Sequence, residues 1–552
     1  MRVGLLTEGG YPYATGEGGQ WCDQLVRGLG RHDFEIYALS RGARQERGGW
    51  YGLPEQVRRV RTAPLWGDPA EGGGGPGPAG GAYGRRERRR FGECFWELAT
   101  AISATDAPGA SDGQDTAGAD GAAGTEDGAA ATGSPGGQAY RFAEALHGLA
   151  DLARDAGGLG PALRSDQALQ TLETACRAPG AHPAAYGTRV ADLLAVSALL
   201  ERALRPLSLD WYGATGGDPG LAAVDLCHAT SAGPAALPGL LAKRFFGTPL
   251  LVTEYEVRLR AYYVNSAARA AGLSLAVRTL LAAFHRLLTA EVYGRADLIT
   301  PGDTQVRRWQ ERCGADRERV RTVHPGVDAL PYEAVGEGAE SGVADDGRTL
   351  VWVGGRAEPC LWEALAAVRE AEPGVRLRIV GTPPPGTGVP DGVPDGVTYG
   401  TAGPETYAAG SVVLTGPADG FPLPLVEAMF CGRATVSPDV GAVREVIGGT
   451  GLVVPARDPR ALADACLTLL RDPGRRLRLG AAARSRALEL FTVERHLTAF
   501  RGIYLELISH APVRHDAPDP SVPFARAAES HPPLSWAARP GRPAAPTWAG
   551  RP

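Results

Sequence analysis

The stretch Asp419–Glu445 reads DGFPLPLVEAMFCGRATVSPDVGAVRE, and it predicts two successive strand–turn–helix units. The apolar run Ser411–Thr415 before it predicts a buried parallel strand, and the acid, glycine and two prolines that follow predict a short helix over Pro422–Cys431. A second strand, Ala434–Ser437, and a second turn and helix, Gly441–Ile447, repeat the pattern. The stretch therefore predicts part of a doubly wound αβα domain.

The predicted helix start at Pro422 is a candidate phosphate site. Unpaired backbone N–H groups near Leu423–Leu425 and the positive end of the helix dipole would suit a phosphate. Asp419 and Glu427 have seven residues between them, and carboxylates there suit the hydroxyls of a sugar or a ribose. Two interpretations stay open at this point: a nucleotide-sugar site, or an ordinary αβ unit.

The acid-x7-Glu spacing of Asp419 and Glu427, with the Gly441–Glu445 turn behind it, resembles the E-x7-E segment of a known family. That family is the retaining, glycogen-synthase-like family four of GT-B glycosyltransferases, and Asp419 stands where its first Glu is usual. The resemblance implies a metal-independent transfer with retention of configuration. No D-x-D motif in a plausible loop suggests a metal-bound diphosphate either, so neither a metal nor another cofactor is expected.

Composition sets outer limits on function. The 552 residues suffice for about two to four domains, and a net charge of −5 gives no indication of nucleic-acid binding. Eight cysteines without C-x-x-C spacing indicate reduced thiols rather than a metal cluster. We expect a soluble, cytoplasmic protein without a transmembrane segment, because no apolar run is long enough for a signal peptide or a span.

The chain opens with a predicted strand–helix–strand unit around a glycine-rich loop. The strand Arg2–Thr7, the helix Gln20–Gly30 and the strand Phe34–Leu39 surround the loop Glu8–Gly19. The wording EGGYPYATGEGGQWCDQLV resembles the opening of the PelF-like branch of family four, the cytosolic polymerases of Pel exopolysaccharide. This resemblance implies a loop near the donor phosphates or the acceptor, with candidate residues Gly18 and Gly19 (donor) and Tyr11 (acceptor); a purely structural turn is the alternative.

The block VDLCHATSAGPAALPGLLAKRFFGTPLLVTEYEVRLR resembles another PelF-like segment. His228 takes the histidine position of that segment on the acceptor side, with a hydrogen-bonded histidine at a strand end as the alternative. Tyr255 replaces the histidine that the family places at the donor sugar, and a phenol donates a hydrogen bond without titrating near neutral pH. Arg258 and Arg260 are acceptor-side or phosphate-side candidates, or else surface arginines.

A second nucleotide contact is predicted after the strand Arg348–Val353. The resemblance implies that Gly355 and Arg356 meet the donor diphosphate, together with a lysine some five residues further on. That position holds Cys360 or Leu361, so one of two phosphate cations is missing. The remaining donor-site candidates belong to the first stretch: Gly420, Phe421, Pro422, Leu423 and Glu427.

Two separate strand–helix series predict the fold class: α/β, of GT-B type, with two doubly wound Rossmann-like domains and a cleft between them. Segments rich in Ala, Gly, Asp or Pro, without apolar periodicity, predict disorder. The predicted organisation is an acceptor-side domain (1–330) with a helical insertion (91–206) and a disordered segment (104–138), a linker (331–347), a nucleotide-sugar-binding domain (348–490), a helix that crosses back (491–510) and a disordered tail (511–552).

The sequence therefore predicts a retaining hexosyltransferase (EC 2.4), with Asp419, Glu427, Arg356 and Tyr255 as its catalytic candidates. PelF resemblance implies a UDP-sugar donor, a glycan or small-molecule acceptor, exopolysaccharide or cell-surface glycan synthesis, and peripheral association with a membrane synthase complex. The alternative is a catalytically degenerate GT-B protein that binds nucleotide sugars or assists assembly. An epimerase or phosphorylase is weaker, because the second predicted domain has no lysine for pyridoxal phosphate.

Overall fold

The computed structural model describes twelve stretches of the chain. Residues 1–509 form one compact unit and residues 510–552 a second, of which only 510 and 511 are described. The candidate residues Gly18, Gly355, Arg356 and Asp419 lie outside the described residues. The described residues are 1–13, 19–65, 83–105, 135–213, 219–260, 263, 272–340, 346–354, 359–380, 395–401, 403–416 and 420–511.

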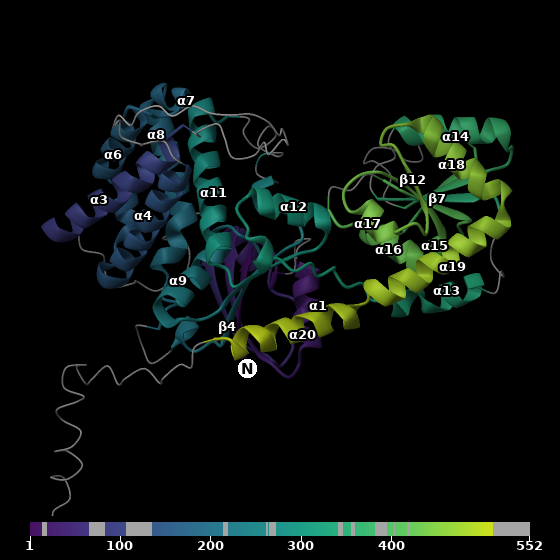
Figure 1. Cartoon of the computed structure of the whole chain (residues 1–552), viewed down its shortest axis with the longest axis horizontal. Helices are drawn as coiled ribbons and strands as arrows, with labels where there is room; N and C mark the ends of the chain where they lie inside the picture. Colours follow the sequence, from purple (N-terminus) through teal and green to yellow (C-terminus); the bar gives the residue numbers. More distant parts are fainter. Residues whose placement is uncertain are drawn as a thin grey trace, which may run out of the picture. The chain divides into compact units, whose positions relative to one another are not determined.

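The first half of the chain is built on a six-stranded sheet in which every paired strand is parallel (Figure 1). Its strand order is β3-β2-β1-β4-β5-β6, so the chain winds outward from β1 in both directions, as in a doubly wound fold. The strands are β1 (Arg2–Glu8), β2 (Asp33–Ser40), β3 (Val57–Pro64), β4 (Leu226–Ala229), β5 (Leu250–Glu254) and β6 (Leu298–Pro301).

The second half repeats this architecture in a separate parallel sheet of order β12-β11-β10-β7-β8-β9. Two doubly wound αβα halves confirm the predicted α/β, GT-B fold class. The strands are β7 (Thr349–Val353), β8 (Arg376–Val380), β9 (Val397–Gly400), β10 (Val412–Thr415), β11 (Ala434–Pro438) and β12 (Leu452–Val454).

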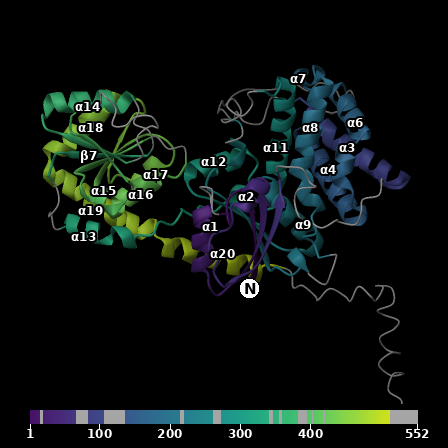
Figure 2. The ribbon, with the colours of Figure 1, turned by 180° about the vertical axis from the view of Figure 1, so that it is seen from behind.

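Helices cover both faces of the second sheet (Figure 1 and Figure 2). Two of them, α14 and α18, share a core with one face, while α16 and Tyr407 of α15 pack on the other. Their residues are α13 (Glu333–Glu340), α14 (Pro359–Ala371), α15 (Pro404–Ala408), α16 (Leu423–Phe430), α17 (Val443–Ile447), α18 (Pro459–Arg471), α19 (Pro473–Leu490) and α20 (Val493–Ser509).

A group of helices enlarges the first half, as predicted, and its core is continuous with one face of the first sheet. The group begins at Arg85, earlier than the expected residue 91, and α4 starts at Pro135, inside the segment expected to be disordered. Residues 106–134 of that segment lie outside the described residues. The helices of the group are α3 (Arg85–Ser103), α4 (Pro135–Ala156), α5 (Leu159–Leu163), α6 (Asp166–Cys176), α7 (Pro183–Tyr186) and α8 (Val190–Leu204). Two later helices, α9 (Leu237–Phe246) and α11 (Leu275–Arg295), follow β4 and β5 and share the same core.

The remaining described elements of the first half are short 3-10 turns and three helices, of which α1 and α12 are the longest. Helix α1 packs its buried residues against the second face of the first sheet, together with the apolar side of α20. These elements are α1 (Gln20–Gly28), α2 (Ala43–Arg47), α12 (Thr304–Arg312) and the 3-10 turns η2 (Arg205–Ser208), η3 (Gly220–Ala222), η4 (Pro234–Ala236), η5 (Arg317–Arg319) and η6 (Leu330–Tyr332).

The predicted linker 331–347 needs a correction, because much of it is helix α13. Gly336 and Ala339 are buried one turn apart, and a Cβ on Gly336 would lie 2.5 Å from the carbonyl oxygen of Phe430 in α16. The helix therefore packs closely through small residues. Sequence periodicity missed it because its buried stripe carries hardly any apolar side chain.

Helix α19 secures the neighbouring helices through its arginines. Arg476 donates to the carbonyl oxygen of Leu469 near the end of α18 at 2.7 Å, and Arg486 donates to those of Val446 and Glu445 in α17 at 2.8 Å. Cations at the carboxyl ends of helices satisfy orphan carbonyls and oppose the negative end of the dipole. The Arg486 contacts hold α17, the helix that follows the turn at Gly441.

Candidate active site

The candidate donor site lies where the winding direction of the second sheet reverses, between β7 and β10. In such sheets ligands bind outside the carboxyl ends of the two central strands. Gly354 follows β7 and Gly416 follows β10; Gly416 N–H donates to the carbonyl of Val353 at 2.8 Å. A Cβ on Gly416 would lie 2.4 Å from the Gly354 oxygen, so the two loops begin backbone against backbone.

The start of α16 differs from the prediction in its backbone hydrogen bonding. The N–H of Leu423 donates to Phe421 at 2.9 Å, the N–H of Leu425 donates to Pro422 at 3.0 Å, and Pro424 has no N–H. The expectation of unpaired amides at Leu423–Leu425 is therefore wrong. The prolines at this turn explain the difference. Pro422 and Pro424 have no N–H to offer, and the two remaining N–H groups are paired within the turn. Any phosphate contact here depends on other groups.

Glu427 is half-buried on the first turns of α16, on the same side as the exposed Leu423 one turn earlier. The hydroxyl of Tyr407 in α15 donates to Glu427 Oε2 at 2.5 Å. Burial, and next the Glu427 carboxylate, raise the pKa of both Tyr407 and Tyr332 well above the ordinary tyrosine value. Sequence analysis did not identify these two tyrosines, because neither belongs to a recognisable motif.

The position of the second phosphate cation is filled by an apolar residue. Leu361 is 1% exposed and belongs to the core between α14 and the second sheet, and Cys360 beside it is half-buried. The first turn of α14 therefore supplies no cation among its described residues. The loss of one of the two diphosphate cations therefore stays a prediction. The other cation, Arg356, lies outside the described residues.

A second group of candidates lies at the carboxyl edge of the first sheet. Arg258, which follows β5, forms an ion pair with Glu8 at the end of β1. The other carboxylate oxygen of Glu8, Oε2, is buried and makes no hydrogen bond to the described residues. The guanidinium is thus held in place by a strand end rather than free for an acceptor, although its side chain keeps 37% exposure.

Glu254 anchors this edge and was not among the sequence candidates. The residue is 2% exposed, accepts from the N–H of Ala232 at 2.9 Å and accepts from the hydroxyl of Tyr293 in α11. Burial raises the pKa of Glu254, against the lowering effect of these donors. The carboxylate joins the loop after β4, the end of β5 and helix α11, so it fixes the backbone that carries Tyr255 and Arg258.

Tyr255 occupies the position at which the family resemblance places a histidine. Its ring meets Trp21 edge-on at 5.2 Å between centroids, and its hydroxyl lies 3.5 Å from His496 Nδ1 of α20. Burial raises the pKa of Tyr255 well above its ordinary value. The residue is therefore a neutral hydrogen-bonding group at any physiological pH.

His228 lies in the core beneath α20, where the protein itself satisfies both ring nitrogens. Nδ1 is 2.8 Å from the hydroxyl of Tyr504 in α20, and Nε2 is 2.7 Å from Oγ1 of Thr253 in β5. The side chain is 0% exposed, and burial, followed by His496, lowers the pKa of His228 to about 3. This environment matches the alternative of a hydrogen-bonded histidine at a strand end.

The buried His228 predicts a dependence of stability on pH. Its folded pKa of about 3 is below an unfolded value of about 6.5, so stability is complete above pH 6.5 and falls as the pH drops toward 3. Between pH 7.5 and 5 the free energy of unfolding of the wild type should decrease as the pH is lowered. In His228→Gln this decrease should be smaller, by up to about 1.4 kcal/mol per pH unit. Urea titrations measure this, and an unchanged slope contradicts the assignment.

His285 provides a second test of the same effect. Burial, and next the charge of Arg258, lower the pKa of His285 to about 3 as well. A second variant, His285→Gln, should therefore remove a similar share of the slope.

The other acceptor-side candidates are placed as follows. Tyr11 is 1% exposed, burial raises its pKa, and its ring stacks on Tyr51 at 6.4 Å. Gly19 lies against the Tyr51 ring and the backbone of Tyr11, since a Cβ there would lie 3.2 Å from the ring and 3.6 Å from the Tyr11 nitrogen. Arg260 lies over the ring of Trp309 in α12 at 6.0 Å. Tyr11 and Gly19 thus shape the loop after β1, and Arg260 extends along α12.

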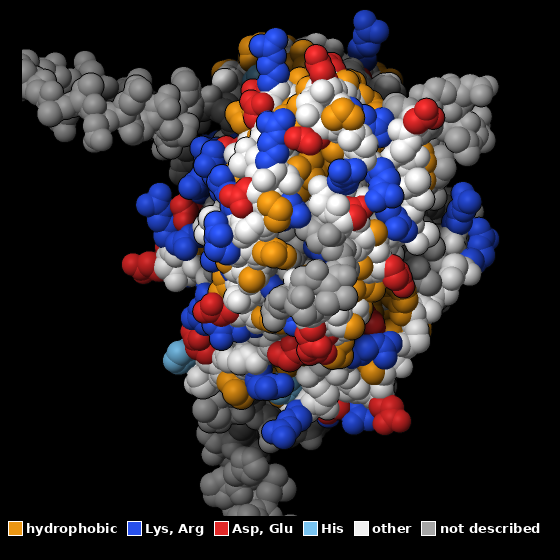
Figure 3. Space-filling view, turned by 90° about the vertical axis from the view of Figure 1, so that its right-hand side faces the viewer, with side chains coloured by type: hydrophobic (Ala, Val, Ile, Leu, Met, Phe, Trp, Pro, Cys, Tyr) orange, Lys and Arg blue, Asp and Glu red, His pale blue; other side chains and the backbone are white. Residues whose placement is uncertain are grey.

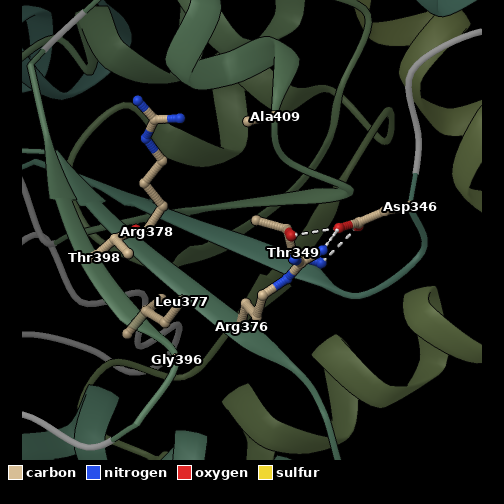
Figure 4. Close-up of a pocket in the computed structure, with 8 residues that line it drawn as sticks. All are labelled: Asp346, Thr349, Arg376, Leu377, Arg378, Gly396, Thr398 and Ala409. Atoms are coloured by element: carbon tan, nitrogen blue, oxygen red, sulfur yellow. Dashed lines mark hydrogen bonds and ion pairs between the residues drawn. The ribbon is translucent and has the colours of Figure 1, made fainter.

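Two further cavities lie away from the candidate donor site. One, of about 430 Å³, is at the amino edge of the second sheet, opposite the carboxyl edge discussed above (Figure 4). There Asp346 pairs with Arg376 and accepts from Thr349, while Arg378 points away from this cluster. The other, of about 350 Å³, lies between the segment 322–324 and the start of α20.

Several general features bear on ligand class. Among the described residues, no group of three or more His, Cys, Asp or Glu side chains could hold a metal ion. No helix in the described part of the chain is long and apolar enough to cross a membrane. On the face drawn in Figure 3, basic and acidic side chains are interspersed rather than gathered by sign, in keeping with the small net charge.

Two family models match the chain. Residues 347–472 match the family described as Glycosyl transferases group 1, which covers the second sheet and the candidate donor site. Residues 1–112 and 142–318, more than half of the chain, match the family described as Domain of unknown function (DUF3492).

Curated relatives include the D-inositol 3-phosphate glycosyltransferase of Frankia alni, 30% identical over 306 residues that cover 49% of this chain and 71% of that protein. The protein of the same name from Thermomonospora curvata is 31% identical, over 48% of this chain and 68% of that protein. The protein of that name from Kineococcus radiotolerans is 32% identical, over 34% of this chain and 52% of that protein.

Solved structures with a similar trace include sucrose-phosphate synthase from Thermosynechococcus elongatus, at 16% identity and a TM-score of 0.48, covering 92% of this chain and 100% of that one. HepE from Anabaena in complex with UDP gives 13% identity and the same TM-score and coverage. The family models and the Frankia alni relative show that the chain belongs to the group 1 glycosyltransferases of family four, nucleotide-sugar-dependent proteins of the GT-B fold, and carries an N-terminal region of the DUF3492 family.

Proposed function

We propose that this chain is a retaining hexosyltransferase that moves a sugar from a UDP-sugar to a hydroxyl group of a glycan or another acceptor. The observation that supports the proposal is the place of Glu427: a half-buried carboxylate on α16, the helix that follows β10 and the Gly416 loop at the switch point of the second sheet. Carboxylates at such a point suit the vicinal hydroxyls of a ribose. Uridine as the base rests on the PelF resemblance alone.

The proposed division of roles follows from these positions. Glu427 binds the donor ribose, Arg356 neutralises the diphosphate and Asp419 contacts the sugar. Tyr255 is a neutral hydrogen-bond donor at the sugar, and stabilisation of the leaving phosphate comes from positioned donors without a metal ion. Because Leu423 and Leu425 have paired amides, Arg356 carries more of this stabilisation than the sequence alone predicts.

The acceptor has two candidate classes. The PelF resemblance favours a growing glycan of an exopolysaccharide or of the cell surface, made by a peripheral partner of a membrane synthase. The curated relatives are named for D-inositol 3-phosphate, which favours a small phosphorylated polyol. Arg260, which lies over Trp309 near the carboxyl edge of the first sheet, suits the second class because a guanidinium recognises phosphate.

A catalytically degenerate, nucleotide-sugar-binding protein is the second candidate function. Two observations favour it: Leu361 is buried where the family has a cation, and Tyr255 stands where it has a histidine. Neither change removes Glu427 or the glycine switch point. The two functions therefore share donor binding and differ in turnover.

The test is sugar-nucleotide turnover by the full chain with UDP-, GDP- and ADP-sugars and with both acceptor classes. We expect transfer with one donor, and loss of more than nine-tenths of it in Glu427→Ala and Arg356→Ala. Release of nucleoside diphosphate and mass analysis of the acceptor product measure the reaction. Binding without hydrolysis or transfer, with both variants impaired in binding only, would establish the degenerate function instead.

A further inference from the structure

Tyr407 is buried against the carboxylate that the donor site presents. Its ring is 1% exposed and packs with Val351, Val353 and Ala428 in the core on one face of the second sheet. Its hydroxyl donates to Glu427 Oε2 at 2.5 Å. A ring enclosed on all sides cannot change rotamer without disturbing that core, so the donor it offers to Glu427 is fixed.

Tyr332, in the 3-10 turn η6, lies against the same Glu427 carboxylate. Its ring meets that of Tyr407 edge-on at 6.0 Å and stacks on Phe430, one turn after Glu427, at 6.3 Å. The Glu427 carboxylate raises the pKa of both phenols, after burial itself, so both stay protonated and remain donors. Three elements, η6, α15 and α16, thus converge on one carboxylate.

We propose that Tyr407 and Tyr332 are positioning residues that set the orientation of Glu427 and thereby make the donor site selective for ribonucleoside over 2′-deoxyribonucleoside diphosphates. A free glutamate loses side-chain entropy when it binds a ligand, a cost that a prior hydrogen bond removes. With Oε2 engaged by a phenol, the remaining acceptor positions of the carboxylate are directed to a vicinal diol. This inference rests on the proposed function.

The test compares a nucleoside diphosphate with its 2′-deoxy form by calorimetry, using whichever of UDP, ADP or GDP binds the full chain. The wild type should prefer the ribonucleotide by roughly tenfold or more, the usual effect of one hydrogen bond to a charged group. Tyr407→Phe should lose most of that preference: affinity for the ribonucleotide falls several-fold, and affinity for the deoxy form changes less than twofold. Tyr332→Phe should show the same pattern with a smaller loss.

Tyr37→Phe is the matched control, because it removes a corresponding bond between a buried phenol and a carboxylate, that of Tyr37 with Glu35 on β2 in the first half of the chain. It should leave the preference intact. Equal weakening of both nucleotides by Tyr407→Phe would reduce Tyr407 to a structural role and overturn the inference, as would an unchanged preference. A wild type that binds nucleotide without preferring ribose overturns this inference and the assignment of Glu427 to the ribose but leaves donor binding in place, whereas a wild type that binds no nucleotide refutes the proposed function itself.

Discussion

Glu427→Ala is expected to weaken binding of the donor nucleoside diphosphate by roughly 10- to 150-fold, the effect of losing hydrogen bonds to a charged group worth about 1.5–3 kcal/mol. The ligand hydroxyls lose their acceptor. The hydroxyl of Tyr407, which is 1% exposed, also loses its partner, and this lowers the stability of the free and the bound protein alike. Calorimetry with the nucleotide that binds the wild type measures the change.

Glu405→Ala is the control for this variant. Glu405 lies on α15, two residues before Tyr407, but its side chain is exposed and faces solvent. The control should bind nucleotide within twofold of the wild type and unfold at the same temperature. If Glu427→Ala binds as tightly as Glu405→Ala while both remain folded, Glu427 does not contact the donor and the assignment of the site to the switch point fails.

The sequence predicted the strands and long helices of both sheets because their apolar patterns are local. The runs that became β1, β5, β7 and β10 are continuous and apolar, as buried parallel strands require. Strand β3 was not predicted, because its exposed side chains include Arg58 and Arg59 and its burial is irregular, as at a sheet edge.

The sequence could predict only those residues of the candidate site that belong to one continuous segment of the chain. Glu427 was proposed from its spacing to Asp419, and Gly416 directly follows the predicted strand Ser411–Thr415. Glu254, Tyr293 and Tyr407 act through contacts between residues 20 or more positions apart, which no local pattern reports. His228 shows the reverse: a motif position drew attention to it, while Tyr504, far along the chain, holds it as part of the core.

The amides at the start of α16 illustrate a limit of motif reasoning. A helix start normally leaves N–H groups free, so Leu423–Leu425 were expected to face a phosphate. Two prolines changed the local bonding, and the N–H of Leu423 turned back to Phe421. Electrostatic stabilisation of a leaving diphosphate then depends on fewer groups, and this makes the geometry of the switch point more important than that of the helix.

Gly416→Ala is therefore expected to have a large effect although it adds one methyl group. The new Cβ would lie 2.4 Å from the carbonyl oxygen of Gly354 and 3.1 Å from the ring of Trp352. Because the nearest atom belongs to the backbone, the strands β7 and β10 must separate at the point where they carry the two donor loops. Overpacking of this kind costs about 1–3 kcal/mol of stability.

Nucleotide binding should fall more than stability, because the separation displaces the Gly354 turn relative to the α16 turn. Gly420→Ala is the matched control for stability: it lies four residues further along the same loop, and no atom of the described residues lies within 4 Å of the position that its new Cβ would take. Urea unfolding and calorimetry on both variants measure the two effects. Gly416→Ala with the stability and nucleotide affinity of the wild type would show that the close backbone contact at the switch point is not required, and that the donor loops are positioned by other contacts.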